Sequence, residues 1–196
     1  RAIYAFSRQH RVAPFSIFYM ALAIYLKRIG CENPIAIGVP VANRLNAIEK
    51  LTGGMFVSTL PFIGELDENW SLNEFSEHLN ENWYDLLRHQ RLPFSEITDL
   101  FRQERQSSDK LFDIVFSYQD SKILENRDAH VSFSGRWLYS GYQAEHLMIH
   151  LSSYAEEFGF SVDYDYLAQL FSESEIDALH SYLTRILSEA IKNPDM

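Results

Sequence analysis

The chain has 196 residues, 46% of them hydrophobic and 14% aromatic, which is enough to form the core of one domain or of one lobe of a larger protein. Its formal net charge of −10 argues against nucleic acid and anionic membranes as partners. The single cysteine, Cys31, excludes an internal disulfide, and without a signal peptide it predicts a reducing, cytoplasmic location. The chain begins at Arg1 instead of methionine, which predicts a fragment of a longer protein.

The first regular element is predicted over residues 14–29. Residues 1–13 are polar and basic without a clear period. Pro14 suits the first turn of a helix, and Gly30 suits the position just after its end. Large apolar side chains lie on nearly every side of 15–26, so we expect a helix buried against a sheet. This apolar run is too short for a membrane span, which takes about 20 residues.

A strand is predicted next, over residues 35–41. Its β-branched side chains alternate with Ala36, Gly38 and Pro40, so one face is bulky and the other is nearly bare. A bare face allows another backbone or a ligand to approach closely. This face is therefore a candidate wall of a binding channel.

A second strand is predicted over residues 55–62, after a polar connection that we expect to be partly helical. Ser58 is the only hydroxyl on the face that it shares with Phe56 and Leu60, and Thr59 points the other way. A lone hydroxyl among apolar neighbours suits a long, thin substrate channel. Two core strands joined by a loop are the alternative interpretation.

The remaining elements follow from the spacing of apolar residues. Helices are predicted over 71–88, 94–103 and 172–192, the last opened by a capping box, and strands over 111–119, 130–141, 145–153 and 158–166. This order favours an α+β fold, a two-layer sandwich with helices packed on a mixed, mostly antiparallel sheet.

Four sequence blocks resemble the C-terminal half of a condensation domain from nonribosomal peptide synthetases. They are IGVPVANR (37–44), GGMFVSTLP (53–61), RHQRLPFSEI (88–97) and LFDIVFSYQ (111–119), and the closing VDYDYLAQLFSESEI (162–176) resembles the family's ending. The blocks keep the family's order and span nearly the whole chain. The resemblance implies a chloramphenicol-acetyltransferase-like fold of two similar lobes, with residues 1–196 as the C-terminal lobe.

The resemblance also implies a reaction and its partners. Donor and acceptor peptidyl carrier proteins bring substrates on 4′-phosphopantetheine arms into a tunnel, where the acceptor amine attacks the donor thioester and an amide forms. The implied partners are the N-terminal lobe, both carrier proteins and the adenylation domain of the same module, and no cofactor binds the chain directly. The family's catalytic signature, two adjacent histidines followed three residues later by Asp-Gly, is absent, since no two of the seven histidines are adjacent. We therefore expect no catalytic residue in this chain and no activity from it alone.

Candidate channel residues lie in the second block. They are Gly54, Phe56, Ser58 and Thr59. The family more often has Asn where Ser58 stands, so a role that depends on the amide side chain of that Asn cannot be transferred to Ser58. The alternative for Ser58 is a core hydroxyl bonded to the backbone. Gly54-Met55-Phe56 resembles a condensation domain more than an epimerisation domain, whose usual version has tryptophan after glycine.

A second group of candidates would contact a carrier's pantetheine arm or the other lobe. They are Asn43, Arg44, His89 and Gln90. Asn43 and Arg44 would pin the loop beside the tunnel, or Arg44 would bind a pantetheine phosphate or form an ion pair between lobes. His89 and Gln90 also have a structural interpretation, since a histidine is favourable at the C-terminal end of a helix.

Several interpretations stay open beside this one. His146 and His150 share a predicted strand face, but a metal site needs a third ligand and a supporting shell, so we expect no metal. The polar stretch 120–129 resembles the family's crossover between lobes, with disorder as the alternative. A non-catalytic lobe that docks carrier proteins, or half of an epimerisation domain, would be the alternative functions.

Overall fold

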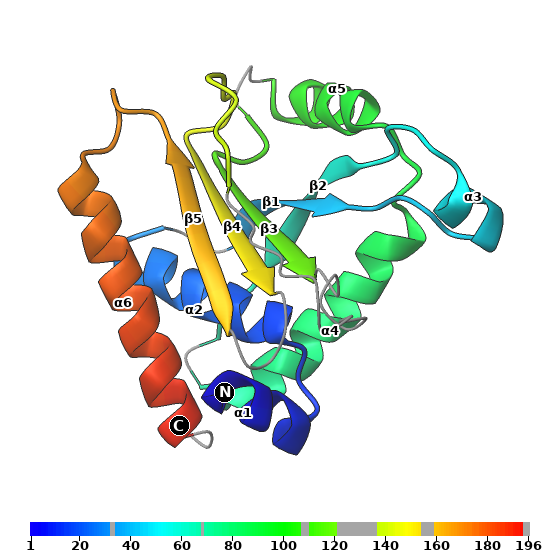
Figure 1. Cartoon of the computed structure of the whole chain (residues 1–196). Coiled ribbons are helices and arrows are strands. Elements are labelled where there is room, and N and C mark those ends of the chain that lie inside the picture. Colours follow the sequence, from blue (N-terminus) through cyan, green and yellow to red (C-terminus); the bar gives the residue numbers. More distant parts are fainter. Residues whose placement is uncertain (32–33, 68, 107–109, 121–136, 154–158, 194–196) are drawn as a thin grey trace, which may run out of the picture.

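The structure is a computed structural model that describes residues 1–31, 34–67, 69–106, 110–120, 137–153 and 159–193. Most of the helices lie on one side of a single sheet in these residues (Figure 1). The helices are α1 (Ala2–His10), α2 (Pro14–Arg28), α3 (Ala47–Leu51), α4 (Leu72–Arg88), α5 (Phe94–Arg105) and α6 (Glu173–Lys192). The strands are β1 (Ile35–Val41), β2 (Ser58–Gly64), β3 (Ile114–Asp120), β4 (Leu147–Ser153) and β5 (Phe160–Tyr166).

The sheet has the strand order β2-β1-β3-β4-β5. The pairs β1–β2 and β4–β5 are antiparallel, whereas β1–β3 and β3–β4 are parallel. The mixed sheet is confirmed, with parallel and antiparallel pairings in equal share. Parallel neighbours need long connections, and the chain supplies them in residues 42–113, which include β2, and 121–146.

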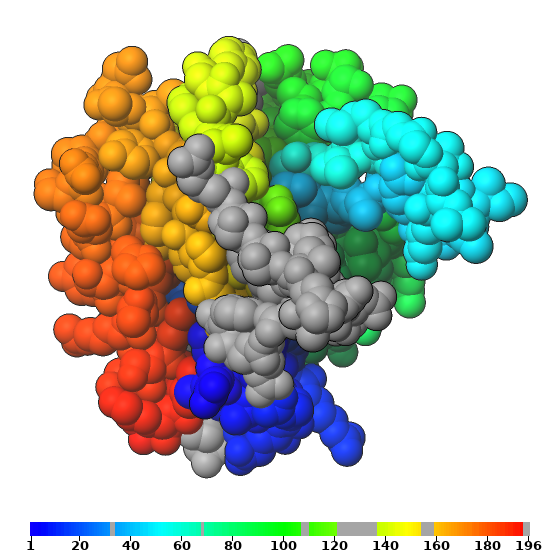
Figure 2. Space-filling model, in the orientation of Figure 1, coloured from blue at the N-terminus to red at the C-terminus, as the bar shows by residue number. Residues whose placement is uncertain are grey.

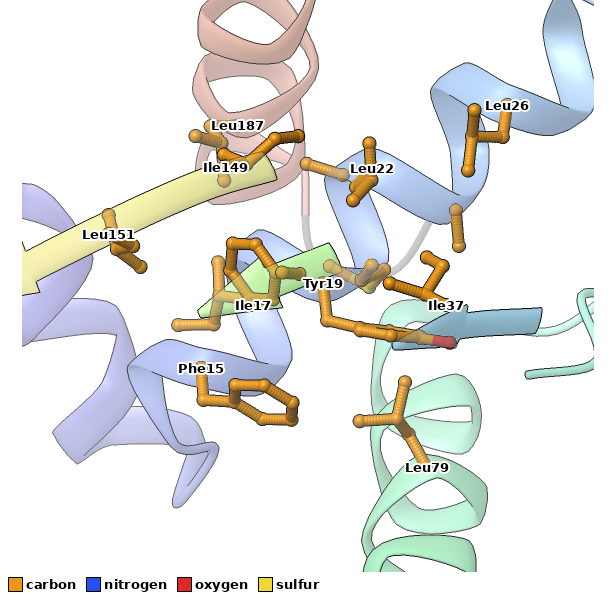
Figure 3. Packing of buried hydrophobic residues seen from close by; sticks show 14 of the residues in the cluster. Phe15, Ile17, Tyr19, Leu22, Leu26, Ile37, Leu79, Ile149, Leu151 and Leu187 are labelled. Atoms are coloured by element: carbon orange, nitrogen blue, oxygen red, sulfur yellow. The ribbon is translucent and has the colours of Figure 1, made fainter. Parts of the chain in front are cut away.

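The core lies between the sheet and α2, which crosses behind the strands in Figure 1. Ile17, Tyr19 and Leu22 are each at most 1% exposed. Figure 3 shows them between Ile37 of β1, Leu79 of α4 and neighbouring side chains of β4 and α6. The helix predicted over 14–29 is confirmed, with Pro14 in its first turn and Gly30 at a φ of +99° just beyond its end.

Helix α1 was not expected, and the interpretation of residues 1–13 as irregular is wrong. Phe6 is only 4% exposed within the core. Tyr4 stacks on Phe160 with ring centroids 4.7 Å apart, and its hydroxyl is hydrogen-bonded to that of Ser153. The N-cap residue Arg1 makes no side-chain capping bond, so tertiary packing stabilises a helix that carries little sequence signal.

Helices α4 and α6 flank α2 on the same face. Both begin with a capping box, and the one predicted at the start of α6 is confirmed as the pair Ser172 and Glu175. The strand predicted over 130–141 and the stretch 120–129 lie mostly outside the described residues, and the described end of that strand, residues 137–141, is irregular, so the prediction is wrong there. Among the described residues, no helix has the length and apolar character needed to cross a membrane.

Strand alternation and register define the two faces of the sheet. Ile37, Phe62, Phe116 and Ile149 share the face that carries the helices. The opposite face, called the far face below, carries Gly38, Val115, Ser117, His150 and Asp163.

Candidate functional site

Most of the predicted site residues meet at one end of the β1–β2 hairpin. Val41, the last residue of β1, pairs with Ser58, the first residue of β2. Residues 42–57 connect the two strands and contain the short helix α3, as expected. This segment, coloured cyan, projects from the body of the molecule in Figure 2. We call residues 42–57 the hairpin loop.

Arg44 organises the hairpin loop from within. Its Nη1 donates to the carbonyl oxygens of Glu49 and Thr52, the latter at 2.6 Å, and its Nη2 donates to that of Gly54 at 3.0 Å. The guanidinium also lies 4.0 Å from the centre of the Phe56 ring. These contacts pin the hairpin loop, which is one of the roles predicted for Arg44, because both of its Nη atoms donate to carbonyl groups of the loop itself.

An ion pair joins the hairpin loop to the turn after α4. Arg91 Nη2 contacts Glu49 Oε1, and Glu49 Oε2 accepts the backbone N–H of Leu45 at 2.7 Å. The Leu45 N–H, followed by Arg91, lowers the pKa of Glu49 below its ordinary value. Neither Arg91 nor Glu49 was among the predicted site residues, because nothing in the sequence pairs two charges 42 positions apart.

Ser58 and Thr59 lie on opposite faces of β2, and Ser58 shares the helix face with Leu60 and Phe62. The expectation that Phe56 shares this face is wrong. Phe56 precedes the strand, and its ring is turned under Arg44. Ser58 is thus half-buried at the mouth of the hairpin, between the helix-covered core and the pinned loop.

Asn43 adopts an unusual conformation beside these residues. Its φ is +51°, which only a few non-glycine residues adopt and which asparagine tolerates best. Its side-chain Oδ1 is buried and has no hydrogen-bond partner among the described residues. A buried acceptor without a donor is uncommon in native proteins. The Asn43 oxygen can therefore accept a hydrogen bond from a group outside the described residues.

His89 and Gln90 occupy different surroundings at the end of α4. Gln90 is 7% exposed, and its Nε2 donates to the Leu87 carbonyl at 2.7 Å, which closes the helix end. His89 is exposed and lines a hollow of about 480 Å³ between β2 and α4. Arg91, the residue after Gln90, forms the ion pair with Glu49 of the hairpin loop.

The nearly bare face of β1 is filled by the chain itself. A Cβ added to Gly38 would lie 2.4 Å from the Phe112 ring, so the ring rests directly on the strand backbone. Phe94 of α5 packs on Phe112, with centroids 5.7 Å apart. The expectation of close approach is confirmed, but at Gly38 the approaching group is Phe112 and not a ligand.

His146 and His150 have separate partners. His146 precedes β4 and places Nδ1 3.1 Å from Asp113. His150 is 3% exposed and stacked on Trp137 at 3.8 Å. Its Nε2 lies 3.2 Å from Asp165 Oδ2 without the alignment of a hydrogen bond, and that oxygen accepts the Trp137 indole N–H at 2.9 Å.

Burial, the largest influence, lowers the pKa of His150 below its ordinary value, although Asp165 opposes the shift. Burial therefore favours the neutral form of the His150 ring. Among the described residues, no three His, Cys, Asp or Glu side chains come together in an arrangement suited to a metal ion.

Replacing Arg44 with lysine is expected to loosen the hairpin loop. Lysine keeps the charge but cannot span three carbonyls as the planar guanidinium does. Since the contacts are largely exposed, we expect a loss of about 1 kcal/mol in local opening free energy, which is roughly fivefold faster amide exchange. Hydrogen exchange over residues 45–57, read by mass spectrometry, measures this, with the exposed Arg102→Lys as the matched control. Unchanged exchange in Arg44→Lys would contradict the pinning role.

Comparison with known proteins finds relatives of this chain within peptide synthetases. The model of the Condensation domain family matches residues 1–196. Surfactin synthase subunit 1 of Bacillus subtilis (strain 168) is 30% identical over 193 residues, and tyrocidine synthase 3 of Brevibacillus parabrevis is 25% identical over 183. The alignments cover 98% and 93% of this chain but only 5% and 3% of those proteins.

Solved structures show the same fold. The condensation domain from the Monacolin K polyketide synthase MokA superposes with a TM-score of 0.80 at 18% identity, covering 100% of this chain and 45% of that one. The first condensation domain of the CDA synthetase gives 0.76 at 16% identity, with 100% and 43% coverage. The match of the family's model to every residue and the shared fold lead to one conclusion: the chain belongs to the condensation domain family.

Proposed function

We propose that this chain is the C-terminal lobe of a condensation domain that joins a carrier-bound acyl or peptidyl donor to a carrier-bound aminoacyl acceptor. The observation that carries this proposal is the coverage. All of the chain superposes on condensation domains, yet it accounts for only 43–45% of their chains. The missing part would be the N-terminal lobe, the first partner of this surface.

The reaction needs an amine and a thioester carbonyl held about 3–3.5 Å apart. The nitrogen lone pair attacks the carbonyl carbon, the carbon–sulfur bond breaks, and the amine proton leaves as the pantetheine thiol is released. A group that takes up this proton or steadies the developing charge accelerates the step. In the resembled family the paired histidines supply that group, and this sequence has no adjacent histidines.

The role left to this chain is to form one wall of the channel and to receive the acceptor. Gly54 and Ser58 would line that wall, with Phe56 and Arg44 as the braced support behind it, whereas Thr59 points from the other face of β2. Asn43, whose buried Oδ1 has no partner within the described ranges, would accept a hydrogen bond from the other lobe or from an arriving pantetheine arm. His89 would contact a carrier protein or the other lobe from its exposed position, whereas Gln90 closes the helix end.

The proposed partners follow from the reaction. Donor and acceptor carrier proteins would each bring a 4′-phosphopantetheine arm, and an adenylation domain would load the acceptor. A solved four-domain nonribosomal peptide synthetase, described as bound to AMP and glycine, contains this fold with a TM-score of 0.82 over 100% of the chain at 19% identity. The exposed lone cysteine, Cys31, suits a reducing, cytoplasmic compartment.

Replacing Ser58 with tryptophan in the intact two-lobe domain is expected to block condensation while the fold is retained. Ser58 is half-buried at the start of β2, so an indole there would project into the proposed channel. Misplacement of a substrate by about 1 Å can lower a rate about 100-fold, and we expect a loss of at least that size. Product formation from both loaded carriers measures it, and circular dichroism checks the fold.

The matched control is Ser140→Trp, at an exposed position outside the strands. It should leave turnover unchanged. Undiminished turnover in Ser58→Trp would exclude Ser58 from the channel wall. Loss of carrier binding in the same variant, without loss of chemistry once substrates are bound, would favour a docking role for this end of the hairpin.

A further inference from the structure

A second hollow lies well away from the hairpin loop, where the C-terminal ends of α2 and α6 and the segment between β2 and α4 meet. Its volume is about 760 Å³, within the range of about 300–1,000 Å³ typical of small-molecule sites. None of the predicted site residues lines it. We call it the α2–α6 groove.

The floor of the groove is apolar and rests on the core. It is lined by Ile24 of α2, by Trp70 just before α4, by Leu72 at the start of α4 and by Ile186 of α6. Leu72 is itself buried. Trp70 and Ile24 are packed against the core cluster, so the floor is anchored to the body of the protein. Such a surface can accept an aliphatic chain or a flat ring by removing apolar area from water.

The rim of the groove carries three cations, Lys27 and Arg28 from the end of α2 and Arg185 from α6. No hydrogen bond or ion pair engages any of the three side chains within the described part of the structure. This is unusual for a chain with a net charge of −10, in which acidic side chains outnumber basic ones.

The two acidic side chains of the groove are already engaged. Glu189 contacts Lys192 at 3.1 Å, and Asp67 accepts from the backbone and side chain of Asn69. Lys27 and Arg28 also face the negative end of the α2 dipole. Arg185 lies in the interior of α6, so the dipole of its own helix end does not explain its position over the same hollow.

We propose that the α2–α6 groove binds a small amphipathic anion, with its apolar body on the Trp70 and Ile186 floor and its carboxylate, sulfate or phosphate group facing Lys27, Arg28 and Arg185. The apolar floor and the three cations, which have no partner among the residues that the structure describes, together favour this class of ligand. A neutral apolar ligand would leave the cations unused, and a bare inorganic anion would leave the floor in water.

Isothermal titration of the full chain with decyl phosphate, below its micelle concentration, tests the proposal. Inorganic phosphate, decyl maltoside and decyltrimethylammonium serve as head-only, neutral and cationic controls. We expect one decyl phosphate per chain, bound at least tenfold more tightly than any of the three controls. The double variant Arg28→Gln/Arg185→Gln should weaken binding by roughly tenfold, since it removes two of the three cations that face the anionic group.

Two further variants complete the test. Ala190→Trp, which fills the groove from α6, should abolish binding. Arg102→Gln/Arg105→Gln on α5 changes the net charge equally at a distance from the groove and should leave affinity unchanged. Equal binding of decyl maltoside, several weak sites per chain, or unchanged affinity in Arg28→Gln/Arg185→Gln would overturn the proposal. Neither Arg28 nor Arg185 is in the core, so weaker binding by Arg28→Gln/Arg185→Gln would not be caused by unfolding.

Discussion

The variant Leu22→Asp is expected to show no cooperative folding. Leu22 is 1% exposed at the centre of α2, between the sheet and α6 (Figure 3). Aspartate would lose the packing of a buried leucine, about 2–5 kcal/mol, and would add an unpaired buried carboxylate that costs several kcal/mol more or must become protonated. Domains of this kind are stable by only about 5–15 kcal/mol. Urea denaturation followed by far-UV circular dichroism measures the effect.

Two matched variants separate burial from charge. Leu22→Ala removes the packing alone and should lower the free energy of unfolding by about 2–5 kcal/mol while keeping a single transition. Leu138→Asp makes the same chemical change at a position that is 70% exposed and should stay within about 0.5 kcal/mol of the parent. A Leu22→Asp protein with a cooperative transition near that of the parent would contradict the placement of α2 in the core.

The second large effect is expected at Gly38. Any side chain there meets the Phe112 ring at 2.4–2.7 Å, closer than real Cβ contacts. Phe112 is 8% exposed and backed by Phe94, so the ring cannot move away without losing its own packing. Gly38→Val should therefore lower the free energy of unfolding by about 1–3 kcal/mol through overpacking.

A double-mutant cycle tests the cause. With Phe112 replaced by alanine, Gly38→Val should cost little, because the space opposite the strand is then free, and a coupling of about 1–3 kcal/mol is expected. Gly53→Val is the matched control, since nothing lies within 4 Å of a Cβ at that position. If Gly38→Val is neutral with Phe112 in place, the contact does not exist as described.

The elements that the sequence predicted best are those whose signal is local. Helix α2 was placed to within one residue because Pro14, the continuous apolar run and Gly30 all lie inside it or at its ends. Helix α1 was missed because it depends on contacts with β4 and β5, which are about 150 residues away along the chain. Its own nine residues have neither a side-chain cap nor an acidic first turn.

The same distinction applies to the candidate site. Asn43, Arg44, Gly54 and Ser58 are close in sequence, so a hairpin necessarily gathers them. The Glu49–Arg91 pair and the contact of Phe112 on the β1 backbone connect distant segments, and no periodicity indicates which partners meet. The bare face of β1 thus predicted a close approach to the strand backbone, but only the folded structure shows that the approaching group is the Phe112 ring.

The central claim is that this chain is one lobe of a two-lobe catalyst and forms no amide by itself. The most direct measurement incubates loaded donor and acceptor carrier proteins with the chain alone, with the intact two-lobe domain, and with an intact domain whose paired histidines are replaced. Dipeptidyl product is then read by mass spectrometry. We expect product above the spontaneous background only for the intact domain, because the chain alone leaves the substrates unpositioned and the amine proton without an acceptor. Clear turnover by the chain alone would contradict the claim and would place a catalytic group among residues 1–196.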